Sequence, residues 1–125
     1  MNRLRSVNTD FWKDPWVEDL KPEEKLLFLY LITNPHTNML GVYEVSMKRM
    51  SSDTGLTEER VSKCFETFER DRKAFYMQTF VLLPNFLKNQ KMNPNMKKNA
   101  VVSFNDLPNW LKESISRNPL KGFES

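Results

Sequence analysis

Apolar and polar positions between residues 46 and 84 follow the periods of two helices and then of a β-hairpin. Ser46 is placed to cap a short helix, and Gly55 stands where that helix needs a left-handed residue to end. Thr57 then caps a longer helix. The apolar residues of this longer helix are spaced by three, one and three positions and therefore share one face: Val61, Cys64, Phe65 and Phe68. Two short apolar runs, 74–77 and 80–83, are separated by two residues and end at a proline, which predicts paired strands. Helix, turn, helix and hairpin in this order predict a winged helix-turn-helix.

The chain before residue 46 predicts two further helices and a strand. After a polar N-terminal stretch, a helix of one or two turns is expected over residues 15–20. The next helix begins at Pro22 and is apolar nearly all round, so we expect it to be the buried central helix. Asn34 and Pro35 end it. Residues 42–45 have the β-branched and aromatic character of a strand that pairs with the hairpin.

Two short helices are expected after the hairpin. Residues 93–95 are interpreted as the end of a connector, with Asn95 capping the first of these helices, and the second begins at residues 107–108. The predicted fold class is α+β, a winged helix-turn-helix with a C-terminal helical extension. We expect residues 1–90 to form the winged-helix domain and residues 91–125 to form a basic connector and a short helical extension.

Composition fits a single globular domain with unevenly distributed charge. The chain has 125 residues, of which 39% are hydrophobic and 28% are charged. No apolar run approaches the ~20 residues of a membrane-spanning helix, and the single cysteine indicates a reducing cytoplasm. Residues 1–87 carry 12 Lys/Arg against 13 Asp/Glu, whereas residues 88–125 carry 7 against 3. A near-neutral part is therefore followed by a basic part, which is typical of either a polyanion contact or a solvated helix face.

Residue types that carry catalysis or bind metals are scarce. His36 is the only histidine, so a His-rich metal site cannot be assembled, and a catalytic triad has no other histidine base to use. Cys64 lies on the apolar face of the long helix, where we expect a buried structural thiol rather than a nucleophile. The chain has only three glycines and no phosphate-binding loop. We therefore expect no enzymatic activity, no metal and no cofactor.

The long helix 58–70 occupies the place of a recognition helix, whose first residues meet base edges in the major groove. Its exposed face is mixed, because Glu58, Glu59 and Glu66 would approach a polyanion. A helix that covers the core or contacts another protein fits this face equally well. The hairpin tip also lacks the arginines that usually contact phosphate. The residues expected to contact DNA are Lys48, Arg49, Thr57, Arg60, Ser62, Lys63, Arg70, Lys88, Lys91, Lys97 and Lys98.

Five segments together resemble a known group of proteins. These segments are residues 12–17, 24–31, 34–38, 41–46 and 83–90, and the last of them, with its PNFLKNQ ending, is the most specific. Residues 3–98 resemble the N-terminal winged-helix region of phage and prophage replication proteins, the replisome organisers related to DnaD-type primosome initiators. The resemblance implies a module that binds double-stranded DNA or self-associates while an origin is opened or a helicase is loaded.

The chain departs from this group in two respects. Such proteins often have glycine in the turn before the hairpin, whereas this chain has residues 71–73, Asp-Arg-Lys. Many also continue into a second helical domain, which puts the helicase-loading role in question more than the DNA contact. The alternatives are a protein-interaction module, as a homodimer or docked to replication or helicase-loading proteins, and a transcriptional regulator. Exposed aromatic residues near the N-terminus favour the interaction module.

Overall fold

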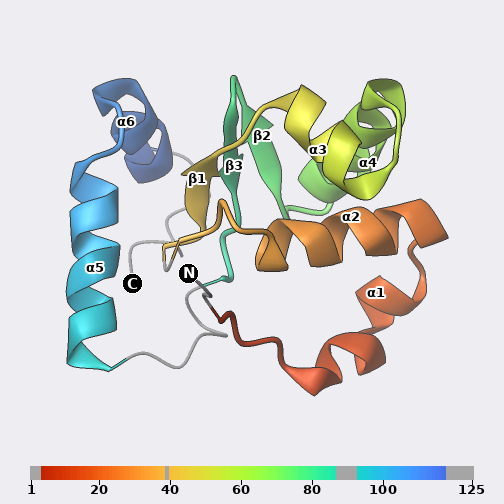
Figure 1. The fold of residues 1–125 in the computed structure, drawn as a ribbon, viewed down its shortest axis with the longest axis horizontal. Helices are drawn as coiled ribbons and strands as arrows, with labels where there is room; N and C mark the ends of the chain where they lie inside the picture. The colour runs from red at the N-terminus through yellow and green to blue at the C-terminus, as the bar shows by residue number, and fades with distance from the viewer. Residues whose placement is uncertain (1–3, 39, 87–92, 118–125) are drawn as a thin grey trace.

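The computed structural model describes residues 4–38, 40–86 and 93–117 (Figure 1). Over these residues the chain forms an α+β structure in which helices surround a small antiparallel sheet. The sheet lies in the middle of the view, with α3 and α4 on one side and α5 and α6 on the other. The elements in chain order are the 3-10 helix η1 (Thr9–Lys13), α1 (Pro15–Glu18), α2 (Pro22–Thr33), β1 (Val42–Glu44), α3 (Met47–Thr54), α4 (Glu58–Arg70), β2 (Phe75–Met77), β3 (Phe80–Leu82), α5 (Pro94–Asn105) and α6 (Asn109–Arg117).

The helix pair α3–α4 is built by the local signals that the sequence contains. The Ser46 hydroxyl accepts a hydrogen bond from the Arg49 N–H at 3.0 Å and caps α3. Gly55 follows α3 with φ of +80°, in the left-handed region that glycine adopts without strain. The Thr57 hydroxyl accepts a hydrogen bond from the Arg60 N–H at 3.2 Å and caps α4. The predicted N-caps of α3 and α4 and the predicted glycine at the end of α3 are confirmed.

The three strands form one antiparallel sheet in the order β1-β3-β2. The predicted hairpin is confirmed, with Met77 opposite Phe80 across its turn. The strand before α3 pairs with β3, as expected, and places Val42 opposite Leu82. Because successive side chains point to opposite faces of a sheet, the strands contribute to a core on each side.

The first core lies between the sheet and the helices α2, α3 and α4. All four apolar residues predicted for the inner face of α4 are buried, which confirms the phase of that helix. Phe68 lies in the middle of an aromatic cluster. Its ring centroid is 5.8 Å from Trp16, 5.3 Å from Phe28 and 5.9 Å from Phe65, in edge-to-face arrangements.

The second core lies on the opposite face of the sheet. Leu111 and Ile115 of α6 are buried there against Val42 and Leu82, with Phe75 of β2 packed at the side. The expected C-terminal helical extension therefore covers this face of the sheet. Among the helices of the described residues, none is long and apolar enough to cross a membrane.

The interpretation of α2 as the buried central helix is confirmed for one face only. Glu24, Leu27 and Leu31 are buried on one face, whereas Leu26 is 46% exposed. The reason is that α2 packs against other elements with this face and leaves the opposite face in solvent. Apolar residues on that face therefore do not indicate burial.

Two helix starts also differ from expectation. Asn93, and not Asn95, caps α5, because its side-chain oxygen accepts a hydrogen bond from the Met96 N–H at 2.9 Å. Pro94 occupies the first helical position, so the last residues interpreted as connector begin the helix. Near the N-terminus, Asn8 caps η1 by accepting a hydrogen bond from the Asp10 N–H at 2.9 Å, within a polar stretch for which no helix was predicted.

Candidate nucleic-acid interface

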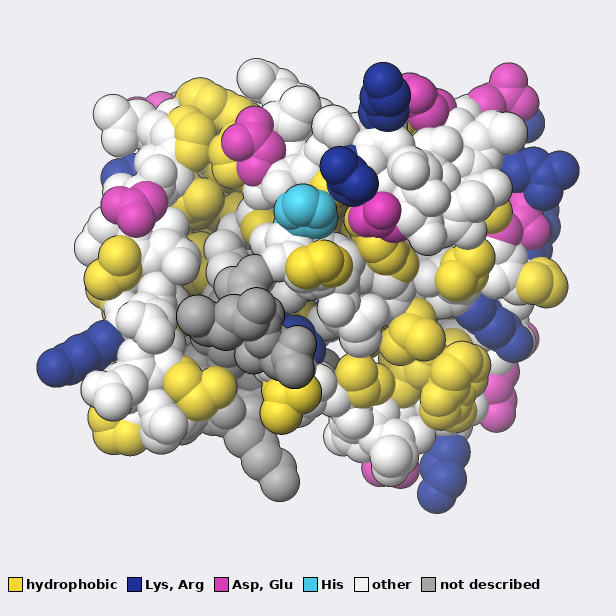
Figure 2. All heavy atoms as spheres, viewed as in Figure 1, with side chains coloured by type: hydrophobic (Ala, Val, Ile, Leu, Met, Phe, Trp, Pro, Cys, Tyr) yellow, Lys and Arg dark blue, Asp and Glu magenta, His cyan; other side chains and the backbone are white. Residues whose placement is uncertain are grey.

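The outer face of α4 carries positive and negative side chains in alternation. Opposite the four buried residues, the exposed residues are Glu59, Ser62, Lys63, Glu66 and Arg70. Figure 2 shows the same mixture of charges at the upper right, over α3 and α4. The basic and hydrogen-bonding groups of a DNA-reading helix are therefore present, together with carboxylates that weaken the attraction to a polyanion.

Two arginines that were predicted to contact DNA each have a carboxylate neighbour in the protein. Arg49 Nη1 lies 3.7 Å from Asp53 Oδ1, one turn further along α3. Arg60 Nη1 lies 3.7 Å from Glu23 Oε2, which brings Arg60 to the side of α4 that meets α2. Both guanidinium groups remain largely exposed, so each pair contributes at most about 1 kcal/mol. A phosphate can therefore replace the carboxylate at low cost.

Arg70 is the third arginine that was predicted to contact DNA, and it takes part in hydrogen bonding at the C-terminal end of α4. Its Nε donates a hydrogen bond to Asp71 Oδ1 at 3.1 Å, and the indole of Trp16 donates to Asp71 Oδ2 at 2.8 Å. Hydrogen bonds from Arg70 and Trp16 lower the pKa of the Asp71 carboxyl below its ordinary value. Asp71 therefore links α1, which carries Trp16, to the C-terminal end of α4, and Arg70 contributes to this link.

Lys48 and Lys63 differ from these arginines. Both side chains are exposed, and within the described ranges no carboxylate lies at ion-pair distance from either. Ser62 is exposed beside Lys63 on α4. The Thr57 hydroxyl, by contrast, is already occupied by the cap of α4. Lys48, Lys63 and Ser62 are therefore the predicted residues of the helix pair that are open to a partner.

The predicted contacts after the hairpin lie elsewhere. Lys97 and Lys98 are exposed on α5, at the opposite end of the view from α4, with the sheet between them (Figure 1). Lys88 and Lys91 lie outside the described residues. The predicted DNA contacts that the structure describes thus fall into two separate groups.

The turn of the β2–β3 hairpin provides no positive charge. Gln78 occupies the turn with φ of +56°, a left-handed conformation that is uncommon for a residue other than glycine. The Thr79 hydroxyl donates a hydrogen bond to Glu44 Oε2 at 2.7 Å, which ties the turn to β1. Any phosphate contact of this turn would therefore depend on uncharged groups.

Glu24 has a structural role that the sequence analysis did not predict. It is only 8% exposed, and its Oε1 accepts a hydrogen bond from the Lys21 N–H at 2.8 Å. Its Oε2 accepts a hydrogen bond from the Thr67 hydroxyl at 3.0 Å, which links α2 to α4. The position of Glu24 three residues after Lys21, with Pro22 between them, is the spacing of a capping box and is the signal that could have identified it.

A second polar link holds α2 against α3. The Tyr30 hydroxyl donates a hydrogen bond to Asp53 Oδ2 at 2.7 Å, and Asp53 also pairs with Arg49. Burial and this hydrogen bond raise the pKa of Tyr30 above its ordinary value. Asp53 thereby fixes the position of α3, which carries Lys48.

The loop between α2 and β1 is held by buried side chains. The Asn34 side chain accepts a hydrogen bond from the His36 N–H at 2.8 Å and donates to the Tyr43 hydroxyl at 2.9 Å. The Tyr43 hydroxyl donates to the Leu31 carbonyl at 2.6 Å, and burial raises the pKa of Tyr43. The polar residues of segment 34–38, which contribute to the family resemblance, therefore have a structural role in this loop.

Groups suited to covalent or metal chemistry are poorly placed. Cys64 is 2% exposed, and burial raises the pKa of its thiol to about 11, so the thiol is protonated at neutral pH. This placement agrees with the expectation of a structural cysteine. Across residues 4–38, 40–86 and 93–117, no three His, Cys, Asp or Glu side chains are grouped so that they could hold a metal ion.

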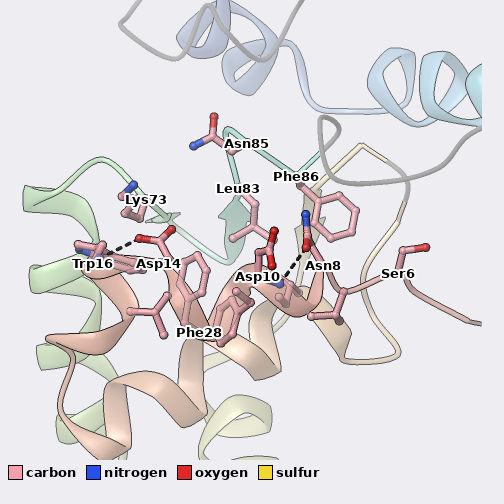
Figure 3. A pocket seen from close by; sticks show the side chains of 14 residues that line it. Ser6, Asn8, Asp10, Asp14, Trp16, Phe28, Lys73, Leu83, Asn85 and Phe86 are labelled. Carbon is pink, nitrogen blue, oxygen red and sulfur yellow. Dashed lines mark hydrogen bonds between the residues drawn. The ribbon is translucent and has the colours of Figure 1, made fainter.

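A cavity of about 250 Å³ opens between the N-terminal segment, α2 and the residues after β3 (Figure 3). Its lining includes the rings of Phe11, Phe28 and Phe86, together with the carboxylate of Asp14 and the ammonium group of Lys73. Its lining therefore combines aromatic surface with charged groups of both signs. It includes none of the residues predicted to contact DNA.

In comparisons with known proteins, no family model matches the chain, and no match is found among curated proteins or solved structures.

Proposed function

We propose that this chain is a non-enzymatic DNA-binding module with a winged-helix fold. The observation that supports the proposal is the packed pair α3–α4, which is followed directly by the β2–β3 hairpin and completed by β1 as a third strand. In a helix-turn-helix, the second helix enters the major groove while the first crosses the backbone. α4 and α3 take these two roles, and the hairpin is the wing.

The charges of the helix pair favour contacts to phosphate over the reading of bases. Lys48 and Lys63 supply direct electrostatic contacts, because neither is neutralised by a described carboxylate. Arg49 and Arg60 contribute after they exchange Asp53 and Glu23 for phosphate. We therefore infer salt-sensitive binding to double-stranded DNA with little dependence on sequence.

The setting of this activity is inferred from the family resemblance. Residues 3–98 resemble the winged-helix region of phage replication proteins, which supports a role in the initiation of phage or mobile-element replication. A homodimer and contacts with replication or helicase-loading proteins belong to the same proposal.

Binding to a labelled duplex of random sequence tests the proposal. We expect measurable affinity by fluorescence anisotropy at low salt, and we expect the double variant K48Q/K63Q to bind more weakly. Because each lost phosphate contact changes the slope of log K against log salt by about 0.9, the slope should decrease by about two. The matched control is Lys13→Gln, which removes an exposed lysine from η1. Equal binding by the double variant and this control would refute the proposed interface.

The second candidate is a protein-interaction module that uses the same helix pair. Two observations favour it, the carboxylates of Glu59 and Glu66 on the outer face of α4 and the pairing of the arginines within the protein. This candidate predicts no DNA binding at low salt, together with a concentration-dependent dimer in light scattering.

A further inference from the structure

α5 has an exposed stripe of two lysines and two valines, in which each valine lies one helical turn after a lysine. Lys97 and Lys98 precede Val101 and Val102 by four residues each, so the four side chains are neighbours on one helix face, here called the α5 stripe. Val101 and Val102 are 60% and 56% exposed, whereas Ala100, on the opposite face, is buried. The stripe therefore faces away from the fold.

The positive charge of the α5 stripe is not neutralised within the described protein. Among the described residues, no carboxylate lies at ion-pair distance from Lys97 or Lys98. The sequence contains no Asp or Glu between residues 72 and 105. The arginines of α3 and α4, by contrast, are each paired with an acid. A partner of the α5 stripe would therefore have to supply the negative charge itself.

We propose that the α5 stripe docks an acidic segment of a partner protein that carries apolar side chains one helical turn apart. Lysines attract the carboxylates of such a segment, and the exposed valines gain free energy when its apolar side chains cover them. An amphipathic helix presents both groups at this spacing. The proposal does not depend on DNA binding by α3 and α4.

Other occupants match the stripe less well. A DNA backbone would satisfy the lysines but would offer no apolar surface to Val101 and Val102. A membrane surface requires a broader apolar face than two valines provide. In a second copy of this chain, the acidic outer face of α4 has no exposed apolar residue among its described positions, and the acids beside the exposed Leu26 and Trp12, Glu23 and Asp10, already pair with Arg60 and Lys13. The acidic, apolar segment therefore fits the combination of charge and apolar surface.

Three fluorescein-labelled helical peptides test this proposal with the full chain in an anisotropy titration. The first peptide combines glutamate with leucine at spacings of three and four, the second replaces glutamate with lysine, and the third replaces leucine with serine. Of the three peptides, we expect only the leucine–glutamate peptide to bind, because a partner of the stripe must supply both negative charge and apolar surface.

Variants of the stripe identify the site of binding. We expect V101S/V102S to weaken binding of the leucine–glutamate peptide about tenfold, because two apolar contacts are lost. We expect K97Q/K98Q to weaken it about fivefold, because two exposed ion pairs are lost. The control V7S/K13Q makes one change of each kind, Val→Ser and Lys→Gln, at exposed positions of the N-terminal segment and should bind as the parent does. Circular dichroism melting verifies that all three variants are folded.

Several results would overturn the proposal. One is binding of the leucine–glutamate peptide that is unchanged in both stripe variants, and another is equal binding of the leucine–lysine peptide. If the leucine–glutamate peptide fails to bind and K97Q/K98Q loses affinity for random duplex DNA, the stripe is a phosphate contact. If it fails to bind and V101S/V102S abolishes binding to phosphatidylglycerol vesicles or self-association in sedimentation equilibrium, the stripe serves a membrane or a second copy.

Discussion

The two sides of the sheet are held together by different kinds of contact. On one side, α2 is joined to α4 by Glu24 and Thr67 and to α3 by Tyr30 and Asp53, in addition to apolar packing. On the other side, within the described residues, α6 meets the sheet through apolar side chains alone, such as that of Leu111. Polar contacts have a defined geometry, so they fix how α2, α3 and α4 lie relative to one another.

The exposed arginines of the helix pair also differ from the exposed lysines of α5 in their contacts. Arg49 and Arg60, at the helix pair, have acidic neighbours in the protein, whereas Lys97 and Lys98 on α5 have none among the described residues. A charge that is paired internally loses part of its attraction for an external partner. The difference therefore makes the unpaired lysines on either side of the sheet the stronger candidates for binding.

The largest expected effect concerns the two cores. Phe68 and Leu111 are both fully buried, one on each side of the sheet. We expect Phe68→Ala to lower the free energy of unfolding by about 3–5 kcal/mol and Leu111→Ala to lower it by about 2–5 kcal/mol. The measurement is urea denaturation followed by circular dichroism and tryptophan fluorescence.

The shape of the transition in these experiments sharpens the comparison. If both cores belong to one cooperative unit, each variant shifts a single transition that both signals report together. A Leu111→Ala variant that leaves the main transition in place and adds a separate early one would show that α5 and α6 unfold independently. That outcome would contradict a shared core on the second face of the sheet.

The next effect concerns the polar link between α2 and α4. Glu24→Ala leaves the Lys21 N–H and the Thr67 hydroxyl without their carboxylate partner, so we expect the free energy of unfolding to decrease by about 1–3 kcal/mol. Glu23→Ala is the matched control. Its partner Arg60 is exposed, so the loss should not exceed about 1 kcal/mol.

A double-mutant cycle tests whether this loss comes from the link itself. With Thr67→Val in the Glu24→Ala background, the two losses should not add, because each substitution removes the same hydrogen bond. Additive losses in thermal or urea denaturation would mean that Glu24 acts through the start of α2 alone.

Both ends of α3 and the start of α4 could be predicted from the sequence because each depends on neighbouring residues. Ser46, Gly55 and Thr57 carry their signals within a few positions, and so does the pairing of two apolar runs across a two-residue turn. The covering of the second sheet face by α6 was not predicted. A signal was present, because residues 75–77 and 80–83 are apolar at every position, as is typical of strands buried on both faces.

The candidate site could be predicted as a set of residues but not as an arrangement. Arg60 and Glu23 are distant in the sequence, and their proximity depends on which face of α2 meets α4. The separation of Lys97 and Lys98 from the helix pair depends likewise on where α5 lies relative to the sheet. Local patterns do not determine such tertiary placements, so the sequence could not tell paired from unpaired charges.

The smallest expected effect concerns the turn that connects α4 to β2. After α4, Arg72 adopts φ of +59°, and the Lys73 N–H donates a hydrogen bond to the Phe68 carbonyl at 2.8 Å. This is the position that glycine usually fills at a helix C-terminus, and a side chain there costs about 1–2 kcal/mol. Because glycine also gains freedom in the unfolded chain, we expect Arg72→Gly to raise the free energy of unfolding by only about 0.5–1 kcal/mol.

The neighbouring residue supplies the control for this prediction. Lys73 has no positive φ, and its ammonium group lies 5.3 Å from the centre of the Trp16 ring. Lys73→Gly therefore relieves no strain, loses a cation–π contact and should destabilise the fold by about 1 kcal/mol. Thermal denaturation of the two variants should thus give shifts of opposite sign. If Arg72→Gly lowers the melting temperature as Lys73→Gly does, the left-handed residue is not strained, and the departure from glycine at this turn has no energetic cost.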